Sequence, residues 1–79
     1  MPRYYFHLLN DVDARDEDGK EFSDLEAARE YAKQCAIFSA AEAIRDQQHF
    51  ISDHRVQVED AEGNVLHTVR FGDVVAVKL

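Results

Sequence analysis

Aromatic and branched side chains are concentrated in three segments of this 79-residue chain, as they are in β-strands. The first segment is residues 3–9, RYYFHLL, in which Tyr4, Phe6 and Leu8 share one face. The other two are residues 54–60, HRVQVED, and residues 64–71, NVLHTVRF. We expect Val56 and Val58 to face inward. In the last segment, Val65, Val69 and Phe71 are expected to line one face of the strand. The pattern therefore predicts a sheet of antiparallel strands.

One long helix is predicted from Asp24 to about Gln47, because this stretch has no Gly or Pro and many alanines. Ser23 is expected to cap the first turn, and Glu26, three residues later, completes a capping box. One side of the helix carries mostly small side chains, which lets it lie close to a sheet. The residues on this side are Leu25, Ala28, Ala32, Cys35, Ala36, Ser39 and Ala43.

The second half of this helix is also apolar on a side that faces away from the small residues. That side holds Ile37, Ala40, Ala41 and Ile44. A helix that is apolar around most of its circumference is buried on two sides. Two kinds of cover are consistent with this pattern. One is the loop at 47–53, which carries Phe50 and Ile51, and the other is a partner subunit.

Two segments share the local pattern Asp-x-acid-Gly-x-x-apolar, namely residues 16–22, DEDGKEF, and residues 60–66, DAEGNVL. A type I turn followed by a left-handed Gly joins two strands in this way, and the Asp can cap the backbone of the turn. We therefore interpret both segments as hairpin turns, with Gly19 and Gly63 in the left-handed conformation.

A calcium loop is the competing interpretation of the first, acidic turn. With Gly19 at the sixth position of that template, Ala14 would stand at the first ligand position and Leu25 at the last. Neither side chain can bind calcium. We therefore expect a solvated turn and no metal site.

The end of the chain, residues 72–79, has two interpretations. Gly72 and Asp73 form a tight loop into a last strand, or Asp73 caps a single helical turn; the β-branched residues favour the strand. Taken together, the elements predict one domain over residues 1–79 of the α+β class. Its expected architecture is ββαββ, an antiparallel sheet with one long helix packed on one face.

Charge and length narrow the classes of function. The chain has 16 acidic and 9 basic residues, for a net charge of −7, and this repels nucleic acid, so no direct nucleic-acid binding is expected. No apolar run approaches the roughly 20 residues that span a membrane, and no signal peptide is recognised. With a single cysteine, Cys35, the sequence predicts a cytoplasmic protein that does not bind membranes.

Four histidines are the main candidates for chemistry. His49 and His54 have the spacing of half a zinc site, but no third ligand accompanies them, and His7 and His67 are single residues within strands. We expect His7 to be a partly buried, hydrogen-bonded structural residue and Cys35 to be a small core residue. No catalytic, cofactor-binding or metal-binding residue is predicted, and the sequence does not indicate an enzyme.

Three stretches resemble a family of short bacterial proteins: MPRYYFHL, DEDGKEFSDLEAAREYA and VQVEDAEGNVLHTVRF. Members begin MPRYFFH or similar, continue with an Asp-x-x-Gly turn and an Asp-Leu-Glu-Ala-Ala helix start, and end with a Gly-turned hairpin. That family has no known function, so the resemblance implies no site residues. The stretch NDVDARDEDG is longer and more acidic here than in the family. A weaker similarity, in element order alone over the first 45 residues, is to bacterial antitoxins.

Two functions remain as expectations. The first is a non-enzymatic protein-interaction module that self-associates, most simply as a homodimer. Its interface would be one of two faces. The outer sheet face is formed by Tyr5, Leu9 and Leu66, and the late helix face is formed by Ile37, Ala41 and Ile44. The second is an antitoxin-like regulator that neutralises a basic partner protein through the acidic half of the chain.

Overall fold

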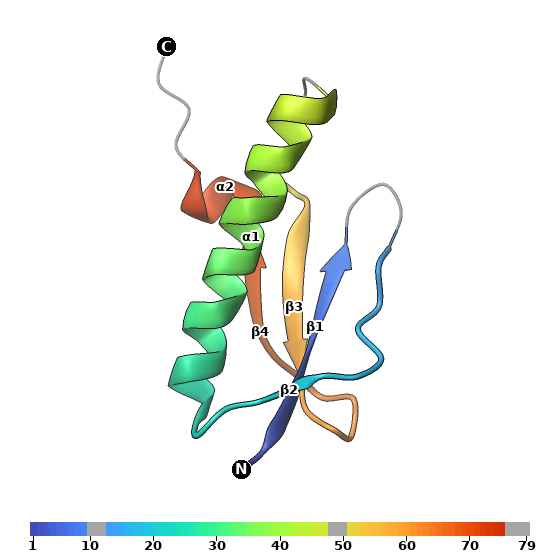
Figure 1. The fold of residues 1–79 in the computed structure, drawn as a ribbon, viewed down its shortest axis with the longest axis vertical. Coiled ribbons are helices and arrows are strands. Elements are labelled where there is room, and N and C mark those ends of the chain that lie inside the picture. The colour runs from blue at the N-terminus through green and yellow to red at the C-terminus, as the bar shows by residue number, and fades with distance from the viewer. Residues whose placement is uncertain (10–12, 48–50, 76–79) are drawn as a thin grey trace.

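A four-stranded antiparallel sheet and one long helix form the protein in a computed structural model that describes residues 1–9, 13–47 and 51–75 (Figure 1). The elements are β1 (Arg3–Leu9), β2 (Lys20–Glu21), α1 (Leu25–Gln47), β3 (Arg55–Glu59), β4 (Val65–Arg70) and α2 (Phe71–Val74). The predicted α+β class, with an antiparallel sheet and one long helix, is confirmed. The predicted ββαββ order fits roughly, because β2 has only two residues and α2 follows β4.

The first strand of the chain lies inside the sheet, whose order is β2-β1-β3-β4. β1 pairs with β3 along its length, with Phe6 opposite Val58, and it pairs with β2 only at its beginning. α1 follows β2 and leads to β3, and it lies across one face of the sheet (Figure 1). β4 is the edge strand on the side away from β2.

Four alanines spaced four residues apart bring α1 against the sheet. Ala28, Ala32, Ala36 and Ala40 are fully buried, and they pack with Val56, Val58, Val69 and Phe71 in one core. The sequence placed Ala40 on the opposite side of the helix, and this was wrong. A helix turn has about 3.6 residues, so a row of residues spaced by four drifts slowly around the helix. The line along which α1 contacts the sheet follows this row and therefore includes Ala40.

An aromatic cluster fills the space between β1 and the first half of α1. The rings of Phe6 and Tyr31 meet edge to face with their centroids 4.9 Å apart, and Phe22 contacts both rings. The Lys20 ammonium lies 4.6 Å from the centre of the Tyr31 ring, where the π electrons attract a cation. This cluster holds β1 against the helix.

The start of α1 is capped by Asp24, because its Oδ1 accepts the backbone N–H of Ala27 at 2.9 Å. The prediction of Ser23 as the cap was therefore wrong by one residue. Both side chains are short oxygen acceptors, so local sequence alone does not choose between them.

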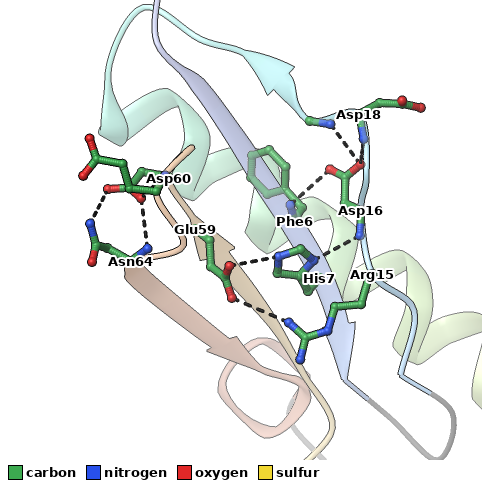
Figure 2. Close-up of polar contacts among 10 residues, drawn as sticks. Phe6, His7, Arg15, Asp16, Asp18, Glu59, Asp60 and Asn64 are labelled. Atoms are coloured by element: carbon green, nitrogen blue, oxygen red, sulfur yellow. Dashed lines mark hydrogen bonds and ion pairs between the residues drawn. The ribbon is translucent and has the colours of Figure 1, made fainter.

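The hairpin between β3 and β4 has the predicted Gly turn. Gly63 lies at φ 86°, and its N–H donates to the carbonyl of Asp60 at 3.1 Å. The Asp60 carboxylate accepts the N–H groups of Glu62 and Asn64 and the side-chain amide of Asn64 (Figure 2). A bulge then shifts the register, so that Val65 stands opposite Glu59 and is 52% exposed. The prediction that Val65 lies on the same face of the strand as Val69 and Phe71 was wrong for this reason.

The chain leaves β4 as a single helical turn, α2, and the strand favoured by the sequence over this part was wrong. Asp73 Oδ2 accepts the N–H of Arg70 at 3.3 Å, which is the capping alternative, and Phe71 is buried in the core. Gly72 donates its N–H to the carbonyl of Ser52 at 3.1 Å. The rest of the predicted last strand, residues 76–79, lies outside the described residues.

Candidate functional site

The segment that returns beside β1 contains a bulge rather than a hairpin turn. Leu8 and Ala14 exchange backbone hydrogen bonds of 2.9 and 2.8 Å, and Tyr4 pairs with Lys20 further along. Between these two pairs, residues 15–19 stand opposite the shorter segment 5–7. Gly19 has the predicted left-handed conformation, at φ 71°. The prediction that this turn joins two strands directly was wrong, because β1 is already paired with Ala14 before the turn begins.

The Asp16 carboxylate takes the place of a strand partner within this bulge. Its Oδ1 accepts the N–H groups of Asp18 and Gly19, and its Oδ2 accepts the N–H of Phe6 at 3.1 Å (Figure 2). Burial raises the pKa of the Asp16 carboxyl. The N–H donors of Gly19, Phe6 and Asp18, together with His7, lower this pKa by more than burial raises it. The net result is a pKa below the ordinary value.

His7 is buried on the face of the sheet away from α1, with 6% of its surface exposed. The N–H of Asp16 donates to His7 Nδ1 at 3.0 Å, so Nδ1 carries no proton in this arrangement. His7 Nε2 lies 3.2 Å from Glu59 Oε1 and donates to it. The other Glu59 oxygen lies 3.7 Å from a guanidinium nitrogen of Arg15 (Figure 2).

This network resembles a catalytic histidine–carboxylate pair, but both nitrogens of the His7 ring have partners within the protein. Asp16 occupies one nitrogen of His7 and Glu59 occupies the other. No lone pair of the imidazole is therefore directed at a substrate or a metal, and the ring is almost fully covered. His7 is hydrogen-bonded, as the sequence predicted, but it is buried where only partial burial was expected. Its partners come from distant parts of the chain and were not predicted.

The other histidines lie apart from His7. The His54 ring meets Phe71 edge to face at 5.8 Å. His67 lies on the side of β4 that faces α1, where burial and the nearby Arg29 lower its pKa. His49 lies outside the described residues. Within residues 1–9, 13–47 and 51–75, no three His, Cys, Asp or Glu side chains are grouped as metal ligands are.

Cys35 is half-buried beside the aromatic cluster. Burial raises the pKa of its thiol more than the Tyr31 hydroxyl and the Lys20 ammonium lower it. The thiol thus stays protonated at neutral pH, as a small core residue does, and lacks the thiolate character of a nucleophile.

The six residues predicted at an interface fall on two separate surfaces. Ile44 is 47% exposed, Ala41 is exposed and Ile37 is half-buried. We call these three residues the distal helix surface, because the last turns of α1 extend beyond the ends of the strands (Figure 1).

The second group lies on the sheet. Tyr5 and Leu9 are half-buried on the face away from α1, and Leu66, at the bulge of β4, is 39% exposed. β3 separates the two strands that carry these residues, so the structure does not bring the three into one patch. The rest of this open face is mainly polar, with Arg55, Gln57, Glu59, Thr68 and Arg70.

Two shallow hollows, which were not predicted from the sequence, flank the edge strand β4. One, of about 310 Å³, is lined by α1, by residues 67–69 of β4 and by Asp73 and Val74 of α2. The other lies on the open face, and Thr68 and Asp73 line both. Successive residues of a strand point to opposite faces, so a hollow lined by three in a row reaches around the strand edge.

Residues 3–72 match the sequence model of a family described as a domain of unknown function, DUF6894. The chain belongs to this family. Comparison with curated proteins and with solved structures finds no significant match. Membership of the DUF6894 family agrees with the resemblance of the sequence to a small family without known function.

A separate observation concerns membranes. None of the helices in the described part of the chain combines the length and the apolar character that crossing a bilayer requires.

Proposed function

We propose that this DUF6894 domain is a non-enzymatic protein-interaction module that self-associates and presents the distal helix surface to a protein partner. The exposure of Ile44 carries the proposal, because 47% of this large apolar residue is open to solvent near the C-terminal end of α1. Ala41 is exposed beside it and Ile37 continues the same side of the helix. A row of this kind fits an apolar partner surface, as in helix-in-groove binding.

The open sheet face suits a partner less well. Two of its apolar residues, Tyr5 and Leu9, are already half-buried, and charged or polar side chains occupy the positions between β1 and the edge strand. Leu66 is the exposed apolar residue of this group, but β3 lies between it and the other two. The distal helix surface is the more continuous apolar site.

Site-specific photo-crosslinking in the native host tests this proposal. A photoreactive amino acid replaces Ala41, and the matched control replaces Ala61, which is exposed in the turn between β3 and β4. The expected result is a discrete adduct with a second protein at position 41 and none at position 61. An adduct between two copies of the chain at position 41 would show that this surface is a self-association interface, as the sequence suggested. The absence of any adduct would contradict a binding role.

A second candidate function, the antitoxin-like regulator, is supported by charge. The chain has a net charge of −7, and Asp13, Glu17, Asp18 and Glu21 are exposed on the segment that returns beside β1. Under this function a photoreactive residue at Glu17 would capture a basic protein, and added salt would weaken capture because exposed charges are screened. Capture at position 41 alone would favour the first function.

A further inference from the structure

The outer edge of β4 has backbone groups that point away from the sheet. The N–H of Phe71 donates to the carbonyl of His54 at 2.8 Å, and in the same register Val69 pairs with Val56 and His67 with Val58. Because backbone directions alternate along a strand, the N–H and C=O of Thr68 point to the free edge. The N–H of Arg70, which points the same way, is accepted by Asp73. The open part of the edge is therefore centred on Thr68.

The side of α1 next to this edge carries a row of charges in a particular order. Glu26, Arg29, Glu30 and Lys33 line the same hollow as residues 67–69 of β4. When the row is laid antiparallel to a copy of itself, each acid meets a base. Glu26 then stands opposite Lys33 of the copy, and Arg29 stands opposite Glu30 of the copy. The row is complementary to itself about the point between Arg29 and Glu30.

The two cations of this row form few ion pairs within the described part of the chain. Arg29 lies 4.0 Å from Glu26, at the limit of an ion pair. Lys33 is exposed and forms no ion pair with any residue that the structure describes. Both cations are therefore available to a second chain.

The charged row and the open edge are neighbours, because the four charged residues line the same hollow as Thr68. Neighbouring strands lie about 4.8 Å apart. Because α1 packs over β3 and β4, two chains joined at β4 would place their α1 helices roughly 10 Å apart, an ordinary helix-packing distance. A single two-fold axis at Thr68 thus satisfies the edge and the charged row at once.

We propose that a second copy of this chain docks against the β4 edge, pairing β4 antiparallel about Thr68 and setting the two charged rows of α1 side by side. This inference rests on the self-association in the proposed function and names the surface that performs it. The sheet becomes continuous across the two copies, and the exposed edge is removed. The distal helix surface lies beyond the paired rows and stays open at both ends of the dimer.

Thr68→Pro tests the edge. Proline removes the N–H of residue 68, which points outward, so the ladder to β3 keeps its hydrogen bonds. The expected result is a folded monomer by circular dichroism and sedimentation, under conditions in which the parent chain is a dimer. A Thr68→Pro chain that is folded and still dimeric would overturn the proposal.

A charge exchange tests the helix row without touching the strand. The double variant Glu26→Lys/Glu30→Arg has an all-basic row, and Arg29→Glu/Lys33→Glu has an all-acidic row. Each variant alone should dimerise roughly tenfold or more weakly than the parent, because four pairs become repulsive. An equimolar mixture should recover a heterodimer. Two variants that each dimerise as tightly as the parent would overturn the proposal.

A third variant separates this inference from the proposed function. Ile37→Glu/Ile44→Lys alters the distal helix surface and should remain a dimer. If this variant is a monomer while Thr68→Pro is a dimer, the docking surface is wrong but self-association stands. A parent chain that sediments as a monomer at several hundred micromolar would overturn both the docking surface and the self-association.

Discussion

The backbone N–H of Asp16 donates to Nδ1 of His7 at 3.0 Å, so a residue in the bulge fixes the tautomer of a buried histidine in β1. The opposite nitrogen is thereby left with the proton that binds Glu59 of β3. His7 thus joins three segments of the chain that are far apart in sequence.

Replacing His7 by Leu should lower the free energy of unfolding by about 1–3 kcal/mol, because the Asp16 N–H and the Glu59 carboxylate lose a buried partner. Urea denaturation monitored by circular dichroism measures the change. His67→Leu is the control, since His67 is partly exposed and has no hydrogen-bond partner among the described residues. A change at His67 as large as that at His7 would argue against the network as the cause.

The Asp16 carboxyl should contribute to the stability of the protein in mild acid and lose this contribution in stronger acid. Its pKa in the folded chain lies below the ordinary 3.8, so the unfolded chain binds a proton at higher pH than the folded chain does. The stabilisation is complete well above 3.8 and disappears as the pH falls through the folded pKa. Asp16→Asn should flatten the dependence of unfolding free energy on pH between about pH 5 and about pH 2. Identical curves for the two proteins would refute this assignment.

The two left-handed glycines should differ in their tolerance of a side chain. A Cβ at Gly63 would meet no atom within 4 Å, so Gly63→Ala should cost about 1–2 kcal/mol from the backbone conformation alone. A Cβ at Gly19 would lie 2.9 Å from the carbonyl oxygen of Tyr4 as well as being strained at φ 71°. Gly19→Ala should therefore destabilise the protein more than Gly63→Ala. Thermal and urea unfolding of the pair will show the order, and the reverse order would contradict it.

Calcium should have little effect on the protein, because backbone N–H groups already occupy both oxygens of Asp16. At millimolar calcium we expect the melting temperature to stay within about one degree of its value in chelator. Magnesium at equal ionic strength is the matched control for screening. A saturable rise of several degrees at micromolar calcium would show that the acidic segment binds metal.

Elements with local signals were predicted well from the sequence. The long helix was predicted from the small residues along one side, and the β3–β4 turn from its Asp and Gly. In both elements the signal comes from residues that are close together in the sequence. Errors arose where a choice depended on tertiary contacts. The bulge that exposes Val65 shifts the strand register by one residue, and the helix cap lies at Asp24, one residue after the predicted Ser23. Such shifts follow from packing and pairing that a local pattern does not contain.

The candidate sites were less predictable than the fold. Ile37, Ala41 and Ile44 could be proposed as an interface from the sequence alone, because they interrupt the polar side of a helix. The His7 network could not, since Asp16 and Glu59 reach it from separate segments. The charged row of α1 looks in the sequence like the solvent-exposed side of any helix. A role in docking can be proposed for it only when β4 is known to be an edge strand.

The position of β1 between β2 and β3 also has a consequence for the order of folding. β1 is the first strand of the domain to be synthesised, and it can complete its pairing with β3 only when Glu59 has been made, because Tyr5 and Glu59 stand opposite each other. The β3–β4 hairpin and α1 are local and can form early, whereas insertion of β1 must close most of the chain into a loop. We therefore expect β1 to dock late and to limit the folding rate. During synthesis we expect its apolar face to stay open until most of the domain has emerged, and apolar surface exposed in this way promotes aggregation.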